Sequence, residues 1–328
     1  MNRGPFSASV SYFGKLAARG DFVKSTGNLP LVSSIDQWVS GGMELLAQDP
    51  RWKMVYDGLS PLDFIFLGSR RHLAIAGHLQ ASQDASQRRF PFLTVATIEV
   101  EQPLRFLARS PMVMSTVWSK LNSMARSVMA ASDPAELLHS IASNSVVVET
   151  DSALYEGSFT DFIEFQTIAT LEAMLDNSGR DISLRRIFLA LGLLLQPVMA
   201  SGASRLGKGL RLPLPADATY RPIVASIWME LISRFLAHAD FELVLFFSHA
   251  ESDPAMVLGF DGASAQTLHS MMDPMADEQY NIDIFDPEWA DAQLRSDYGI
   301  AKLASYMAQP HLNLKLCIDT FREAFVGG

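Results

Sequence analysis

Short apolar runs separated by polar turns predict strands in the first half of the chain. Three such runs follow one another at residues 64–67, 73–76 and 92–98, and a polar loop at residues 80–89 precedes the third. Runs of this length with turn residues at their ends are typical of β-strands. Two more runs, at residues 241–247 and 256–260, predict neighbouring strands across the loop 248–254.

Longer segments instead repeat their apolar residues every three or four positions, as a helix does when one face packs on a core. The first begins near Ser33, which can cap it, and includes Trp38, although Gly41 and Gly42 weaken its middle. The same period predicts further helices at residues 112–129, 134–142, 159–175, 221–238 and 313–327.

The length of 328 residues suits two domains of ordinary size. A polar, turn-prone cluster at residues 176–181 separates two apolar periodic segments and is the best boundary. We predict an N-terminal α/β domain at residues 1–178 and a C-terminal α/β domain at residues 179–328. Because hairpin-like loops and helices both connect the strands, the predicted fold class is α/β, with two layered α/β sandwich domains whose mixed sheets are flanked by helices.

Composition narrows the classes of partner and the compartment. Hydrophobic residues make up 48% of the chain and charged residues 19%, which predicts a globular protein. A formal net charge of -10 opposes binding to phosphate backbones, so we expect no nucleic-acid partner. We also expect a cytoplasmic protein without membrane insertion, because no segment approaches the roughly 20 apolar residues of a membrane span. Cys317 has no second cysteine to pair with.

The segment Tyr12-Phe13-Gly14-Lys15-Leu16-Ala17-Ala18-Arg19-Gly20-Asp21-Phe22-Val23 is the most informative part of the sequence. Asp36-Gln37-Trp38 follows it, and later a run from Asp84 to Arg88-Arg89-Phe90-Pro91-Phe92. These pieces, in this order, resemble the signature of the type VI secretion-associated TagF (ImpM) family. Ala17 stands where that family usually has proline. The segments 207–215 and 257–264 also resemble the longer members of the family.

The resemblance implies a non-catalytic, cytoplasmic regulator that represses a type VI secretion system after translation. Its implied partner is the forkhead-associated scaffold protein of that system. Two other classes remain open, namely an enzyme whose site is assembled from distant residues and a structural accessory subunit of the secretion machine.

The residues of the signature have two interpretations, bracing of the loop or contact with the partner. In the first, Gly20 permits a positive φ, Arg19 and Asp21 brace the loop through charge-assisted hydrogen bonds, and Phe22 inserts into the core. In the second, the same residues and the basic pair Arg88 and Arg89 bind the partner. The candidate residues for partner binding or loop bracing are Lys15, Arg19, Gly20, Asp21, Phe22, Trp38, Arg88, Arg89, Lys208 and Arg211.

The segment 202–209 has the glycine and lysine spacing of a phosphate-binding loop, but it lacks the parts that would make it work. Gly209 stands where a hydroxyl should hold magnesium, and Pro213 and Pro215 prevent the following helix. We therefore predict no nucleotide cofactor.

Other constellations also fall short of a site. The loop 248–253 contains serine, histidine and carboxylates, but sequence neighbours in a loop rarely converge as a triad, so we predict a solvated connection. The seven histidines lack the short spacing of zinc ligands, and the apolar helical stripe around Cys317 predicts a buried, protonated thiol. The acidic stretch 273–297 lacks a calcium-loop pattern and is either a solvated face or a docking site for a basic partner. We predict no catalytic, cofactor-binding or metal-binding residues, and no enzyme activity.

Overall fold

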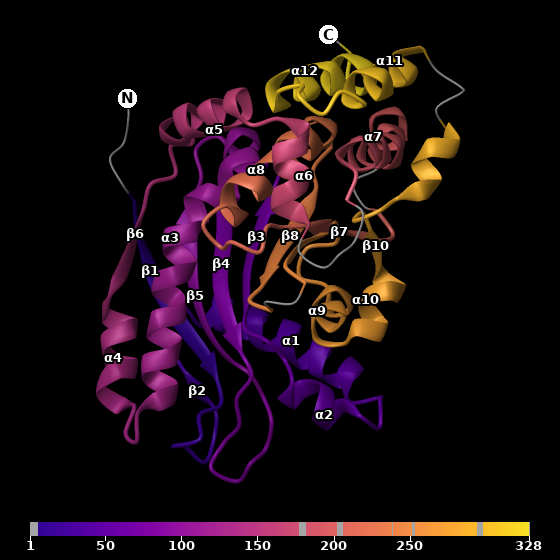
Figure 1. Cartoon of the computed structure of the whole chain (residues 1–328). Helices are drawn as coiled ribbons and strands as arrows, with labels where there is room; N and C mark the ends of the chain where they lie inside the picture. Colours follow the sequence, from indigo (N-terminus) through magenta and orange to yellow (C-terminus); the bar gives the residue numbers. More distant parts are fainter. Residues whose placement is uncertain are drawn as a thin grey trace.

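A computed structural model describes residues 6–176, 182–201, 206–237, 239–250, 253–293 and 298–327. Within these residues, ten strands form one sheet in the order β10-β7-β9-β8-β3-β4-β5-β1-β2, and β6 pairs with β1 (Figure 1). The strands are β1 (Phe6–Gly14), β2 (Val23–Lys24), β3 (Leu62–Gly68), β4 (Leu73–Gln80), β5 (Phe92–Glu99), β6 (Ser145–Val148), β7 (Gly209–Pro213), β8 (Glu242–Ser248), β9 (Ala255–Gly259) and β10 (Asn281–Asp283).

The sheet is continuous across the two halves of the chain. Strand β3 pairs antiparallel with β8, from Leu62 opposite Ser248 to Gly68 opposite Glu242. Only β10 and β7 pair in parallel among the described strands, so the sheet is mixed, as the sequence predicts. The predicted class, an α/β fold with a mixed sheet flanked by helices, is confirmed, but the described strands of the two halves form one sheet and not one sheet in each half. The proposed boundary between residues 178 and 179 lies outside the described residues, and the division into domains stays a prediction.

Helices cover both faces of the sheet. Helices α3 and α8 pack on one face, and α1 with α9 packs on the other. Helices α5, α7, α11 and α12 gather at one end of the sheet (Figure 1). The helices are α1 (Leu29–Leu46), α2 (Trp52–Asp57), α3 (Pro103–Ala130), α4 (Ala135–Ser143), α5 (Ala153–Phe165), α6 (Ile168–Leu175), α7 (Leu184–Ser201), α8 (Arg221–Leu236), α9 (Ala265–Met272), α10 (Pro274–Tyr280), the 3-10 helix η1 (Glu288–Gln293), α11 (Tyr298–Met307) and α12 (Leu314–Phe325). Of the described helices, none has the length and apolar character needed to cross a membrane.

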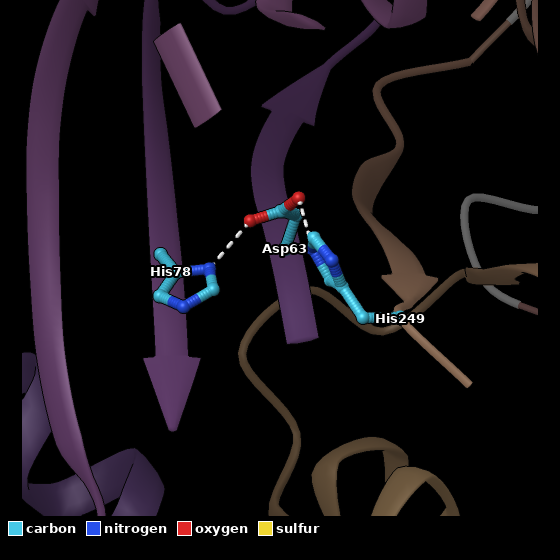
Figure 2. Close-up of side chains that lie close together, drawn as sticks. All are labelled: Asp63, His78 and His249. Carbon is cyan, nitrogen blue, oxygen red and sulfur yellow. Dashed lines mark hydrogen bonds and ion pairs between the residues drawn. The ribbon is translucent and has the colours of Figure 1, made fainter. Parts of the chain in front are cut away.

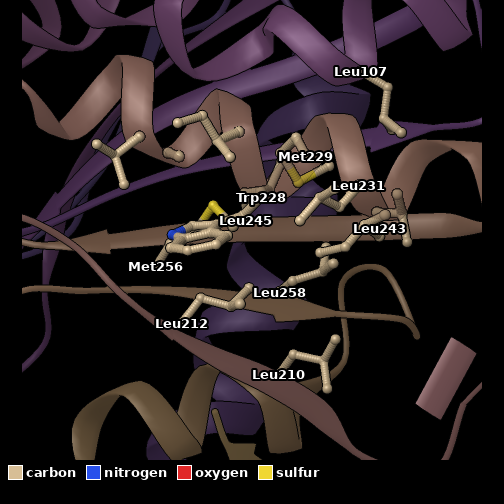
Figure 3. Close-up of a cluster of buried hydrophobic side chains, with 14 of the residues drawn as sticks. Leu107, Leu210, Leu212, Trp228, Met229, Leu231, Leu243, Leu245, Met256 and Leu258 are labelled. Atoms are coloured by element: carbon tan, nitrogen blue, oxygen red, sulfur yellow. The ribbon is translucent and has the colours of Figure 1, made fainter. Parts of the chain in front are cut away.

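The core under α8 shows how the apolar periods of a helix and of strands meet. Trp228 and Leu231 of α8 face Leu245 of β8 and Leu258 of β9, and all four are buried (Figure 3). The indole Nε1–H of Trp228 donates to the carbonyl oxygen of Pro213 at 2.9 Å. The polar atom of this buried ring is therefore satisfied, and the ring connects α8 to strand β7.

The period predicted most elements but not their ends. Strands β3, β4, β5, β8 and β9 are confirmed, and β8 and β9 are neighbours as predicted. The predicted helix 159–175 is two helices, α5 and α6, because Thr167 and Thr170 form a capping box that begins α6. Helix α1 begins earlier than predicted, since the side chain of Asn28 accepts a hydrogen bond from the backbone N–H of Leu31.

The two glycines in α1 have a packing role. A Cβ added at Gly42 would lie 2.8 Å from the side chain of Leu268 in α9. One added at Gly41 would lie 3.0 Å from the Cβ of Ala265. The glycines therefore let α1 and α9 approach closely, which offsets their weak helix propensity.

Candidate functional site

The family-like segment begins at the end of strand β1, where the backbone passes very close to the chain before β5. Gly14 has φ +136°, and a Cβ at this position would lie 2.1 Å from the carbonyl oxygen of Pro91. Only glycine tolerates both conditions. The bracing interpretation predicted a positive φ at Gly20. That prediction is wrong, because Gly20 is not among the described residues with positive φ.

Asp84 is the residue that holds the loops of the signature together. Its carboxylate is buried and lies 3.0 Å from the Nζ atom of Lys15 and 2.6 Å from the Nε atom of Arg88. The backbone N–H groups of Ser86 and Arg88 each donate to its Oδ1 atom at 2.9 Å. Burial alone would raise the pKa of Asp84, but these hydrogen bonds hold the pKa well below its ordinary value. The carboxylate is therefore ionised, and it fixes both loops around itself.

Arg19 and Asp21 do not brace the loop through their side chains as predicted. Arg19 pairs with the exposed Asp133 at 2.7 Å, and within the described residues Asp21 accepts only from the backbone N–H of its neighbour Phe22 at 2.8 Å. The loop is held instead by the backbone N–H of Ala85, which donates to the carbonyl oxygen of Arg19 at 2.8 Å. The physical reason is burial, since a carboxylate as exposed as that of Asp21 gains little from bracing.

Arg88 and Arg89 have different partners, although they are neighbours. Besides its contact with Asp84, Arg88 donates from its guanidinium to the carbonyl oxygen of Gly20 at 2.8 Å, and its side chain is largely exposed. Arg89 makes a two-point contact with Asp57, with both distances 2.7 Å. Arg88 thus connects the 84–88 loop to the 19–22 loop, and Arg89 connects the same loop to the end of α2.

Phe22 lies at the surface of the signature. The prediction that it inserts into the core is wrong. The side chain is 42% exposed and stacks on Phe13 with ring centroids 5.4 Å apart. Its ring meets Phe90 edge-on at 4.9 Å, and the Nζ atom of Lys15 lies 4.9 Å from its centroid. An aromatic ring that is fixed by its neighbours and partly exposed to solvent suits contact with another protein, because aromatic residues are enriched in interfaces.

Trp38 is buried, and it joins the two halves of the chain. Its ring packs against Phe64, Phe66 and Phe246, and its Nε1–H donates to the carbonyl oxygen of Ser264 at 3.2 Å. Phe246 and Ser264 belong to the second half, so Trp38 connects the signature helix to the C-terminal strands and α9.

Lys208 and Arg211 lie away from the signature, at strand β7. Five strands separate β7 from β1 in the sheet, so the structure does not bring these residues together with Lys15 or Arg88. Lys208 is exposed. Arg211 is surrounded by carboxylates, those of Asp253 at 2.6 Å, Asp277 at 3.2 Å and Asp283 at 3.3 Å.

An aspartate and two histidines meet at the ends of β3, β4 and β8, and this cluster was not predicted. His78 of β4 and His249, which follows β8, approach Asp63 of β3 from two sides (Figure 2). The Nδ1 atom of His78 and the Nε2 atom of His249 each lie 2.7 Å from an oxygen of Asp63. The loop 248–253 was predicted to be only a solvated connection, and pairing of β3 with β8 is what brings His249 to Asp63.

The charges of this cluster support one another. Burial opposes ionisation of Asp63, but the hydrogen bonds from the two imidazoles lower the pKa of its carboxyl group. The hydrogen bond to Asp63 raises the pKa of His249, against the effect of burial. An ionised carboxylate only accepts hydrogen bonds, so both facing ring nitrogens carry protons in this arrangement. The ligand atoms lie within 4.8 Å of one another, so the same three residues, once deprotonated, could hold a metal ion of the zinc type.

A third feature is an apolar cavity of about 830 Å³ between α1 and the strands β3 and β4. Trp38, Phe66, Leu73 and Ile75 are among its lining residues, and Leu73 is exposed. Its volume is that of cavities that take a drug-sized molecule or a few apolar side chains.

The N-terminal part of the chain matches a known protein family. Residues 11–143 match the model of a protein family described as the TagF N-terminal domain, type VI secretion system-associated. No curated protein matches the chain. The chain is similar to PA0076 from Pseudomonas aeruginosa PAO1, whose crystal structure is known, with 22% sequence identity and a TM-score of 0.35. That similarity covers 41% of this chain and 61% of the chain of PA0076, so this chain spans only part of the length of PA0076.

Proposed function

Because residues 11–143 of this chain carry a TagF N-terminal domain, which makes it a type VI secretion-associated protein, we propose that it is a non-catalytic repressor of such a system. In this proposal it acts in the cytoplasm, after translation, by binding the forkhead-associated scaffold protein of the machine. The match of residues 11–143 to the family model is the observation that carries the proposal. The repressor role is inferred by analogy with that family.

Repression by binding needs no chemistry. A protein that binds the unassembled scaffold more tightly than the assembled one shifts the scaffold away from the active machine. The signature offers a surface for this, formed by Arg19, Phe22 and Arg88 around the buried Lys15, which we call the signature surface. The buried Asp84 contacts Lys15 and Arg88, and Arg88 donates to the carbonyl oxygen of Gly20 in the loop that carries Arg19 and Phe22, so the surface is formed before any partner binds. Preorganisation of this kind lowers the entropic cost of binding.

Two surface variants test this proposal without removing the Asp84 contacts. Phe22→Ala removes the exposed ring, and Arg19→Glu reverses a charge whose pair with Asp133 is exposed. We expect each to weaken binding of the purified scaffold at least about tenfold, as loss of a central interface residue does. Overexpression of the parent protein should stop release of the secreted tube protein, and the two variants should stop it less, with the amounts of the machine's components unchanged.

Matched controls come from the same chain. Phe165→Ala removes an even more exposed ring, and Lys120→Glu reverses an exposed charge, both away from the signature. They should bind and repress like the parent. If secretion continues under overexpression and the scaffold is absent from pull-downs, the regulatory proposal is wrong. A further variant, Leu73→Ser, changes an apolar residue that lines the 830 Å³ cavity. If only this variant loses binding, the partner occupies the apolar cavity instead of the signature surface.

A second candidate function, hydrolysis assisted by a bound metal ion, is favoured by the cluster of Asp63, His78 and His249. A zinc ion with three protein ligands keeps a fourth position for water and lowers the pKa of that water. Elemental analysis of the purified protein tests this candidate, since about one equivalent of metal that is lost in Asp63→Ala would favour it over a purely structural role.

A further inference from the structure

A second cavity, of about 510 Å³, lies between the helices α3, α5, α8 and α12 and is lined by an excess of positive charge. Four guanidinium groups but only two carboxylates line it, on a chain whose formal net charge is -10. The charged lining residues are Arg105, Arg109, Arg234, Arg322, Glu156 and Glu230. A third carboxylate, that of Asp319, contacts Arg322 at 3.2 Å from outside the lining.

Arg109 is the innermost cation of this cavity. It is 4% exposed, and its guanidinium lies 2.7 Å from Glu230, 2.9 Å from Glu156 and 3.6 Å from the ring centroid of Phe159. Its Nε atom is buried and has no hydrogen-bond partner among the described residues. A buried guanidinium that keeps a free donor is held in place with part of its binding capacity unused.

Glu230 is already shared among three cations. Its carboxylate accepts from Arg109 at 2.7 Å and from Arg234 at 3.5 Å, and it also contacts Arg322. Glu156 pairs only with Arg109 among the described residues, and Asp319 contacts Arg322, so Arg234 has only its long contact with Glu230 in that part of the chain. The buried Arg109 therefore has two carboxylate partners, and the uncompensated positive charge lies with the exposed Arg105 and Arg234.

The mouth of the cavity presents cations that are still available. Arg105 is exposed and forms no hydrogen bond or ion pair with the described part of the chain. Arg234 is exposed as well, and its contact with Glu230 is the long one. Ser152 and Ala153, at the N-terminal end of α5, complete this side, where the helix dipole adds positive potential.

We propose that this cavity binds a small molecule that carries a multiply charged oxyanion group, either a phosphate or diphosphate ester or a polycarboxylate. Guanidinium forks match the paired oxygens of both groups. The volume of about 510 Å³ lies within the range of small-molecule sites. The site joins α3 of the first half to α8 and α12 of the second, so an anion bound there would hold these helices together.

The test is calorimetric titration of the full chain with inorganic diphosphate and, separately, with citrate, at constant ionic strength set with chloride. We expect saturable binding of at least one of these probes, and the tighter probe identifies the class of anion. Arg105→Ala and Arg234→Ala should each weaken it about tenfold, the typical effect of one lost charged hydrogen bond. Arg126→Ala, which removes an exposed arginine from the same helix α3, should leave it unchanged.

Two results would overturn the proposal. One is the absence of saturable binding of both probes. The other is equal weakening in the Arg126 variant, which would show that the probes respond to net charge and not to this cavity. Because Arg105 and Arg234 are exposed, their variants should fold, and an unchanged melting temperature without ligand confirms that point.

Discussion

Asp84→Ala should lower the free energy of unfolding by about 3–5 kcal/mol, the usual cost of removing one partner of a buried ion pair. The change leaves the buried ammonium group of Lys15 without its carboxylate, 3.0 Å away in the parent protein. It also leaves two backbone N–H groups and the Nε atom of Arg88 without their acceptor. Denaturant unfolding at pH 7 measures the loss.

A comparison within the signature separates this role from the one predicted for Asp21. Asp21→Ala removes a carboxylate that, among the residues the structure describes, accepts only from the next backbone N–H, so its effect should stay within about 0.5 kcal/mol. Lys15→Met combined with Asp84→Ala should cost less than Asp84→Ala alone, because no buried charge is then left unpaired. If the Asp21 variant loses stability and the Asp84 variant does not, the bracing role belongs to Asp21 after all.

The pH dependence of Asp84 has a definite sign. Its folded pKa is depressed below the ordinary value of 3.8, so its contribution to stability is present above that value. The contribution is lost only as the pH falls through the folded pKa. The difference in stability between the parent and Asp84→Ala should therefore be constant from pH 5 to pH 7 and shrink in stronger acid.

Sequence reasoning predicted elements well where the signal is local. Residues 92–98 are buried between two layers of helices, so their apolar run is long and continuous, and strand β5 was found. Strand β1 was not predicted, although serines alternate there with apolar residues. Strand β10 has only three residues and no detectable period.

Contacts between distant segments could not be predicted from one sequence. The pairing of β3 with β8 brings Asp63 and His249 together across 186 positions, and no spacing rule reports it. The same limit applies to the signature, where the sequence places Arg19 two residues before Asp21 but cannot show that the buried Asp84 contacts both Lys15 and Arg88. The sequence shows which charged residues are present. Their roles depend on burial, which only the tertiary fold decides.

The cluster of Asp63, His78 and His249 gives the second large effect. Asp63→Ala should cost about 3 kcal/mol at pH 6, because the fully buried His78 loses its hydrogen-bond partner. His249→Ala should cost only about 1 kcal/mol, because the imidazole of His249 is partly exposed and solvent screens its charge. Asp161→Ala, which removes an exposed aspartate on α5, is the matched control and should change little.

The pH dependence then distinguishes an ion pair from a metal site. The folded pKa of His249 is raised above 6.5, so its contribution to stability is complete below that pH and is lost as the pH rises through the folded value. The parent should therefore lose its advantage over His249→Ala between neutral and alkaline pH. A bound metal ion requires neutral imidazoles, so its stabilisation would instead grow as the pH rises and would disappear with a chelator. An advantage that increases from pH 6 to pH 8 would exclude the ion pair as the source of stability and assign these three residues to a metal.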